Sequence, residues 1–283
     1  MAVRVRVFTD PLCVWSWGSE PGIRSLMCEF GDDVLFTFSM AGLARELSPD
    51  GALVHSWLDA AAESGMPADP RVLRGSPPRS SYPMSMAAKA AGDQGPAAAY
   101  RYLRALREGS VALRRKLDTT EALVEEARGA GLDAERFRVD LDSHGTVEAF
   151  GADMEAAAVL AASGDPAASG GHSVAEGGRG LPLPTFVIDG ADHGGAERPV
   201  VLSGLQSPAA LREAVLGAGA APAVGSRPEP IAALRRFGRM APVEVAAVCD
   251  LPLPKAEADL AALALEWRIR PVAVGGGRLW ELA

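Results

Sequence analysis

Cysteine is scarce in this sequence: of 283 residues only three are cysteine, namely Cys13, Cys28 and Cys249. Small secreted domains stabilised by disulfides carry several closely spaced cysteine pairs. No disulfide framework is therefore expected, and a reducing cytoplasm is the expected location. The N-terminus lacks the apolar core of a secretory signal peptide. No uninterrupted run of about 18 apolar residues occurs either, so no membrane-spanning helix is predicted.

Positive charge is scarce as well. Lysine and arginine number 28 against 36 aspartate and glutamate residues, which gives a formal net charge of −8. Nucleic acids and anionic membranes attract clustered cations, so neither is an expected partner. The four histidines show no metal-ligand spacing, and no phosphate-binding loop or serine-hydrolase motif is present. Neither a metal site nor a bound cofactor is predicted.

The first forty residues predict a βαβ unit. Residues 2–9 alternate apolar with polar side chains, which is typical of a strand with one buried face. Asp10 precedes a proline that ends this strand. A single helix is predicted for residues 14–30, and a second strand for residues 33–40. Parallel strands joined by a helix require a right-handed crossover, so the fold class is α/β.

A long helical region follows and then the sheet resumes. Helical spacing dominates residues 52–162, and strands are predicted at 184–189 and 198–203. Ser207 precedes a proline and begins a further helix, because proline is tolerated in a first turn. These patterns predict a domain over residues 1–220, in which a helical insertion interrupts the sheet.

The rest of the chain divides into loops and a small tail. Residues 164–180 are rich in glycine and are interpreted as a mobile loop. Residues 221–230 form a linker, and residues 231–283 show three helices followed by two short strands, an order that resembles a winged helix. The last of these helices, residues 255–267, carries one lysine and three acids. DNA binding needs clustered cations, so the tail is expected to pack or to bind protein.

Cys13 is the residue that points to chemistry. It stands where a strand ends and a helix begins, and free N–H groups at a helix start favour a thiolate over a thiol. A thiolate is the form that attacks disulfides. Ser16 follows one helical turn later, where its hydroxyl either stabilises that thiolate or is an ordinary first-turn residue. A hydroxyl cannot close a disulfide, so Cys13 and Ser16 cannot store one.

Neither of the other cysteines is expected to replace the missing thiol. Cys28 lies 15 residues after Cys13, and on one continuous helix this spacing is about 20 Å at 1.5 Å per residue. A disulfide needs Cα atoms within about 7 Å. Cys249 is in the tail, and its interpretation is a buried thiol in a small core.

Several segments together resemble the DsbA-like branch of the thioredoxin superfamily. The resemblance covers about residues 3–216, and its segments are Phe8-Thr9-Asp10-Pro11-Leu12-Cys13-Val14-Trp15-Ser16-Trp17, Ser81-Tyr82-Pro83, Pro184-Thr185-Phe186-Val187-Ile188-Asp189-Gly190 and Ser203-Gly204-Leu205-Gln206-Ser207. In that branch the first motif reads Cys-x-x-Cys, whereas serine takes the second cysteine's place here. The resemblance implies a thioredoxin-like fold with a helical insertion, in which Pro184 is cis and lies beside Cys13.

The same resemblance implies which residues would bind a substrate. Leu183, just before Pro184, would offer its backbone to an extended peptide or to glutathione. Pro11 and Trp15 flank the cysteine in the motif and are assigned to substrate binding with them. For Trp15 the alternative is packing in the core, where aromatic side chains near such a site are common.

Members of this branch without signal peptides include three kinds of protein. Some are cytoplasmic FrnE-like oxidoreductases, and some are ClpXP adapters for the Spx regulator that carry an atypical winged helix after the DsbA-like domain. Others are kappa-type glutathione transferases and hydroxychromene-carboxylate isomerases, which use serine at the first position. Cys13 disfavours the last kind, and the two-domain layout favours the second as an architecture.

Two main hypotheses of function follow. In the first, the protein is a monothiol thiol-disulfide oxidoreductase or isomerase: Cys13 attacks a protein or glutathione disulfide, and an external thiol releases the adduct. In the alternative, the protein is a redox-inactive peptide-binding or proteolysis-adapter protein that uses the thioredoxin groove and binds a partner through its C-terminal domain. Glutathione transfer to an electrophile is a third and disfavoured hypothesis. Glutathione would act only as a co-substrate.

Overall fold

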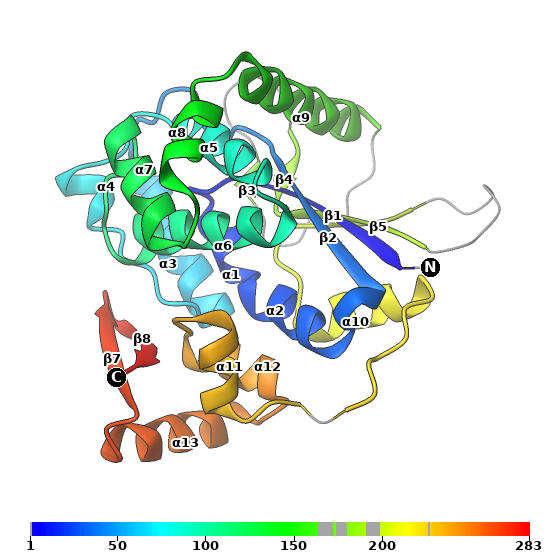
Figure 1. Cartoon of the computed structure of the whole chain (residues 1–283), viewed down its shortest axis with the longest axis vertical. Helices are drawn as coiled ribbons and strands as arrows, with labels where there is room; N and C mark the ends of the chain where they lie inside the picture. The colour runs from blue at the N-terminus through cyan, green and yellow to red at the C-terminus, as the bar shows by residue number, and fades with distance from the viewer. Residues whose placement is uncertain (1, 164–171, 174–179, 191–198, 226) are drawn as a thin grey trace.

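The computed structural model describes residues 2–163, 172–173, 180–190, 199–225 and 227–283 (Figure 1). Most of the loop predicted at residues 164–180 lies outside this described part. Within it, none of the helices combines the length and the apolar character needed to cross a membrane.

A four-stranded mixed sheet forms the centre of the fold, with strand order β2–β1–β5–β6. Its strands are β1 (Val3–Thr9), β2 (Val34–Met40), β5 (Thr185–Asp189) and β6 (Val200–Ser203). β2 runs parallel to β1, whereas β5 is antiparallel to both of its neighbours. The predicted βαβ unit is therefore present, and β2 lies at one edge of the sheet.

The alternating pattern of β1 divides its side chains between two helical layers. Val3, Val5 and Val7 are at most 1% exposed and pack with residues of α2 (Glu20–Glu29) and α10 (Pro208–Gly217). Arg6 points to the opposite face, where its guanidinium lies 3.6 Å from the carboxylate of Asp153 on α9 (His144–Ala162). The helical insertion thus covers one face of the sheet, and α2 and α10 cover the other (Figure 1).

The helix predicted for residues 14–30 is wrong in one respect, because two helices occupy this region. α1 (Val14–Gly18) ends at Ser19, and α2 begins at Glu20. Pro21 lies in the first turn of α2, where it has no N–H to continue the hydrogen bonding of α1. Cys28 is therefore on α2 and Cys13 is at the start of α1.

The insertion is helical throughout its ordered elements, as predicted. The elements are α3 (Gly51–Ser64), α4 (Val72–Gly75), α5 (Tyr82–Gly92), α6 (Pro96–Arg107), the π-helix η2 (Glu108–Ala112), α7 (Thr120–Gly129), α8 (Ala134–Leu141) and α9 (His144–Ala162). A short 3-10 helix, η1 (Gly31–Asp33), precedes β2. Thr119 caps α7 by accepting a hydrogen bond from the N–H of Ala122.

The C-terminal part contains three helices and a hairpin, in the predicted order. They are α11 (Pro230–Phe237), α12 (Pro242–Cys249), α13 (Leu253–Leu265), β7 (Ile269–Val274) and β8 (Gly277–Leu282). Met240 forms an isolated β-bridge with Trp280 of β8. The third helix begins and ends two residues earlier than the range 255–267 predicts. Its assignment as a winged helix, and the domain limits, stay predictions.

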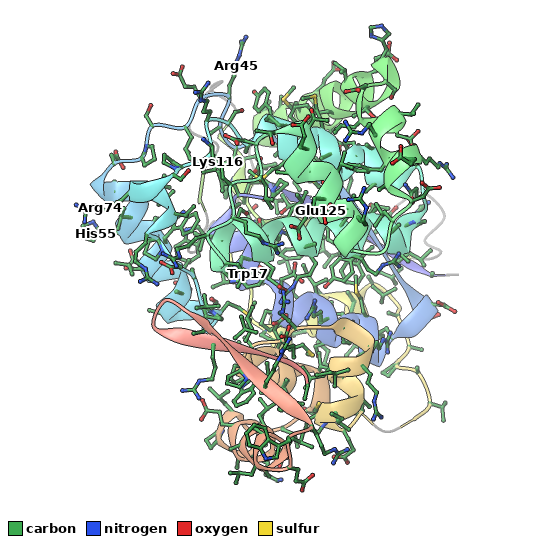
Figure 2. The ribbon with its side chains drawn as sticks, turned by 60° about the vertical axis from the view of Figure 1, so that its left-hand side comes forward. Trp17, Arg45, His55, Arg74, Lys116 and Glu125 are labelled. Atoms are coloured by element: carbon green, nitrogen blue, oxygen red, sulfur yellow. The ribbon has the colours of Figure 1, made fainter. Side chains whose placement is uncertain are left out.

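A buried cluster of charged side chains connects the C-terminal part to the rest of the chain. α12 packs against α2. At this contact lie five charged side chains that pair with one another, and none is more than 6% exposed: Glu20, Arg24, Arg104, Arg107 and Glu244. Trp17 lies against the cluster, with the Arg104 guanidinium 4.1 Å from its ring centroid (Figure 2). The two parts are therefore joined by charge pairing as well as by apolar contact.

Candidate functional site

Cys13 lies at the junction between β1 and α1. Asp10 ends the strand by accepting a hydrogen bond from the N–H of Leu12 at 2.8 Å, which turns the chain. Cys13 then takes the N-cap position of α1, where its sulfur accepts a hydrogen bond from the N–H of Ser16 at 3.4 Å. The thiol in turn donates to the carbonyl oxygen of Leu183, 3.8 Å away. The sulfur is held between α1 and the segment before Pro184.

The surroundings of Cys13 oppose ionisation. Its side chain is 0% exposed, and burial raises the pKa of the thiol because a thiolate would lose its hydration. Hydrogen bonding by Ser16 and the positive charge of Arg107 lower this pKa, but they do not offset the burial; the negative charge of Asp10 raises it further. The predicted thiolate at a helix start is therefore wrong for this structure. α1 has only five residues, so its end offers little compensation.

The backbone of Leu183 is already paired within the chain. The Leu183–Pro184 peptide bond is cis, and β4 (Pro182–Leu183) pairs with β3 (His172–Ser173) in an antiparallel register that sets His172 opposite Leu183. The prolines on either side of Leu183 have no N–H groups. The ladder between these two residues must therefore use the N–H and carbonyl of Leu183 itself.

This pairing bears on two sequence-based expectations. The stretch 164–180 was expected to lack regular structure, yet His172 and Ser173 form a strand within it. The resemblance assigned the backbone of Leu183 to an extended peptide, and a segment of the same chain pairs with it here. A substrate that used those groups would have to displace β3.

The remaining predicted site residues gather around Cys13 but are buried. Pro11 precedes the cysteine, and its carbonyl accepts from the hydroxyl of Ser110 at 3.5 Å. Trp15 is 7% exposed, belongs to the main hydrophobic core and donates its indole N–H to the hydroxyl of Ser56 at 3.0 Å. Of the two interpretations of Trp15, the structure has core packing. Ser16 is 1% exposed.

Two charged groups near the cysteine were not among the predicted site residues. Asp10 is fully buried, and its carboxylate accepts hydrogen bonds from the N–H of Leu43 and the hydroxyls of Ser81 and Ser85. Burial nonetheless raises the pKa of this carboxyl. Arg107, also fully buried, donates to the hydroxyl of Thr9 and pairs with Glu20. Asp10 belongs to the motif around Cys13, and Arg107 belongs to Leu103-Arg104-Ala105-Leu106-Arg107-Glu108, a segment that also resembles the DsbA-like branch, but neither resemblance assigned the residue a role.

The other cysteines lie elsewhere. Cys28 and Cys249 are free, like Cys13, and both contact the core cluster of the C-terminal helices. Burial raises the pKa of the Cys249 thiol to about 12. No set of three or more histidine, cysteine, aspartate or glutamate side chains in the described part of the chain is arranged to hold a metal ion.

Comparison with known proteins places the fold. A family model described as Thioredoxin matches residues 7–169. The chain is 29% identical over 297 aligned residues to a protein of Halalkalibacterium halodurans named ClpXP adapter protein SpxH, covering 99% of this chain and 88% of that one. The SpxH adapter of Bacillus subtilis is 26% identical, with coverage of 99% and 89%. These relatives are matched over nearly the whole chain, including the C-terminal part.

Solved structures resemble the DsbA-like part. A putative protein disulfide isomerase from Nitrosomonas europaea superposes with a TM-score of 0.61 at 16% identity, covering 77% of this chain and 97% of that chain. The cytosolic disulfide reductase DsbM from Pseudomonas aeruginosa gives 0.55 at 20% identity, with coverage of 76% and 97%. A probable DsbA oxidoreductase from Streptomyces coelicolor gives 0.54 at 23% identity, with coverage of 76% and 89%. The family model spans more than half of the chain and these neighbours share its fold, so the chain belongs to the thioredoxin family, in the DsbA-like branch of its superfamily.

Proposed function

We propose that this protein is a proteolysis adapter, which binds a protein and presents it to a ClpXP-type protease in the cytoplasm, and that Cys13 has a structural role in it. The observation that carries the proposal is the complete burial of the Cys13 thiol, whose pKa is raised. The named adapters that match 99% of the chain support the same conclusion. Their match spans nearly the whole chain, including the C-terminal part, whereas the similar solved structures cover at most 77% of it.

Thiol-disulfide exchange makes two demands that this site does not meet in its observed state. The attacking sulfur must be a thiolate, whereas burial raises the pKa of the Cys13 thiol. The sulfur must be reached by a disulfide, whereas its side chain is 0% exposed. Position 16 is a serine, so release of an adduct would also need an external thiol. A binding protein needs none of these.

Alkylation of the folded protein tests the chemical half of the proposal. Iodoacetamide is added over pH 6–10, and the labelling of each cysteine is followed by mass spectrometry. Cys28 is half-buried and serves as the internal reference, and the urea-unfolded protein serves as the control for intrinsic reactivity. Cys13 is expected to react at least about 100-fold more slowly in the folded than in the unfolded protein, because only the thiolate reacts. Labelling of folded Cys13 with a midpoint below pH 7 would overturn the proposal.

A degradation assay tests the other half. Purified ClpXP and the Spx regulator are incubated with and without this protein, and the remaining Spx is quantified over time. Wild-type protein and the Cys13→Ser variant are both expected to accelerate degradation, since serine keeps a hydroxyl that can accept from Ser16 and donate to Leu183. No acceleration by the wild type contradicts adapter function for this cargo. Acceleration by the wild type that Cys13→Ser abolishes contradicts a structural role for the thiol.

One observation favours a second function, the monothiol oxidoreductase. Cys13 keeps the N-cap geometry of a thioredoxin-type nucleophile, with the Ser16 N–H aimed at its sulfur at 3.4 Å. If β3 were displaced, a glutathione mixed disulfide would be the substrate that one thiol can process with a second glutathione. DsbM, a structural neighbour, has been solved with GSH. Turnover of a glutathionylated peptide by the wild type, lost in Cys13→Ser, would establish this function instead.

A further inference from the structure

A large open cavity of the described structure lies away from Cys13. It is an open groove of about 1010 Å³, bordered by β2, α6 and the C-terminal part. Its wall contains Phe36 and Phe38 from the sheet, Tyr100 and Arg101 from α6, and Arg236 from α11. Neither Cys13 nor Leu183 lines it, so a ligand of this groove would not use the site already described.

One border of the groove is an unpaired edge of the sheet. β2 hydrogen-bonds to β1 on one side, and none of the described strands pairs with its other side. Within the part of the chain that the structure describes, the backbone of residues 35–38 makes no hydrogen bond beyond the β1–β2 pairing. Leu35 on this edge is 49% exposed. An unpaired, partly apolar edge is a surface on which an extended peptide can add a strand.

Aromatic side chains form the floor beside this edge. The rings of Phe36 and Phe38 stack with centroids 6.3 Å apart, and Phe38 stacks on Tyr100 at 5.5 Å. Both phenylalanines are only half-buried. Alternate side chains of a strand added to β2 would point to this face. Apolar or aromatic groups at these positions would cover the exposed parts of Phe36 and Phe38.

Two arginines of the groove have no carboxylate partner among the described residues. Arg101 donates only to the carbonyl of Ala130, and Arg236 to the carbonyl of Met27 and the sulfur of Cys28. The other arginines of the wall are in ion pairs: Arg24, Arg104, Arg115 and Arg239. Both guanidinium groups are exposed. They are therefore available to a carboxylate of a partner, although the net charge of the chain is −8.

We propose that this groove binds an extended acidic segment of a partner protein, which adds as a strand to the outer edge of β2. The backbone of the segment pairs with residues 35–38, and its apolar side chains cover Phe36 and Phe38. Its carboxylates pair with Arg101 and Arg236. A polynucleotide fits less well, because it has no row of backbone N–H and carbonyl groups that could pair with residues 35–38 as an added strand does. The groove is separate from Cys13, so this assignment goes beyond the adapter function and holds whether or not a protease is the destination.

Peptide binding tests this assignment. The probe is a fluorescein-labelled peptide of two Glu-Phe-Asp-Val repeats, and the control probe carries lysine in place of each acidic residue. Fluorescence anisotropy measures both against the full chain at about 50 and 300 mM salt. The acidic peptide is expected to bind saturably and more weakly at the higher salt concentration, because screening weakens exposed charge pairs. The lysine peptide is expected not to bind.

Charge reversal locates the site. The double variant Arg101→Glu with Arg236→Glu is expected to weaken binding of the acidic peptide at least tenfold. The matched control is Arg138→Glu on α8, an equally exposed arginine outside the groove, which is expected to bind as the wild type does. All three substitutions change surface side chains, and circular dichroism checks that both variants fold.

Hydrogen exchange gives a readout specific to strand addition. Bound acidic peptide is expected to slow exchange of the outward-facing amides among residues 35–38. Three results would overturn the proposal: no saturable binding of the acidic peptide, equal loss of binding in Arg138→Glu and the double variant, or protection confined to the neighbourhood of Leu183.

Discussion

Replacement of Glu244 by glutamine is expected to destabilise the contact between the C-terminal part and the rest of the chain. One oxygen of this carboxylate lies 3.0 Å from Nη1 of Arg24 and 3.1 Å from Nη1 of Arg104. The three side chains are at most 6% exposed, so water cannot take the carboxylate's place. Glutamine has nearly the same shape but no charge. The three buried arginines would then keep only two neighbouring carboxylates, those of Glu20 and Glu108.

The size of the effect follows from the cost of leaving buried charge unpaired. Breaking a buried ion pair from one side costs about 3–5 kcal/mol, and in a chain of this size 1 kcal/mol shifts Tm by about 2–4 °C. Tm is therefore expected to fall by roughly 6–20 °C, as measured by scanning calorimetry of the full chain. The matched control is Glu266→Gln, whose side chain is 60% exposed and pairs with Arg268 at 3.2 Å; its Tm should stay within about 1–2 °C of wild type. A fall of about 2 °C or less for Glu244→Gln would refute this account of the buried cluster.

Two further outcomes concern alkaline stability and the hairpin. Burial raises the pKa of Cys13, so the thiol stabilises the fold fully below its unfolded pKa of about 8.5 and this contribution disappears as pH rises through the folded value. Urea denaturation at pH 8, 9 and 10 should show a steeper loss of unfolding free energy in wild type than in Cys13→Ala, and equal slopes would contradict the burial argument. Gly275 has φ +49°, and a Cβ there would lie 2.6 Å from the carbonyl oxygen of Ala68. Gly275→Ala should therefore cost about 1–3 kcal/mol, whereas Gly276→Ala, which meets nothing within 4 Å, should unfold as wild type in the same titration.

Much of the fold could be predicted because its signals are local. Strand alternation in residues 2–9 and the helix start at Ser207 depend on neighbours within four residues, and both appear where expected. The break at Ser19 was missed because helical spacing continues across it, and Pro21 reads equally well as part of a helix or as a new first turn. Composition cannot choose between these, since tertiary packing of α2 against β1 and α12 decides where the new helix starts.

The sequence predicted which segments lie next to Cys13 but not the state of its thiol, and the functional role of these residues stays a prediction. The motif correctly brought Cys13, Leu183 and Pro184 together, because a resemblance fixes which elements meet. Whether the thiol ionises depends on total burial, and burial is contributed by side chains far away in the sequence. The strand at His172 was invisible in a glycine-rich stretch, since two residues carry no periodicity. The pairing of Arg107 was not predicted either, because its partner Glu20 lies 87 positions away in the sequence.

A cysteine without redox turnover still has a physical reason to occupy position 13. Its sulfur caps α1 by accepting from Ser16, and its S–H reaches the carbonyl of Leu183, so one side chain ties the helix to β4. Free cysteine behaves as a small hydrophobe with weak donor and acceptor capacity, which suits a site that is 0% exposed yet has polar partners on two sides. Alanine would lose both contacts. A match to the thioredoxin motif at Cys13 therefore identifies the fold, whereas access to the sulfur, which is completely buried here, determines whether the thiol can react.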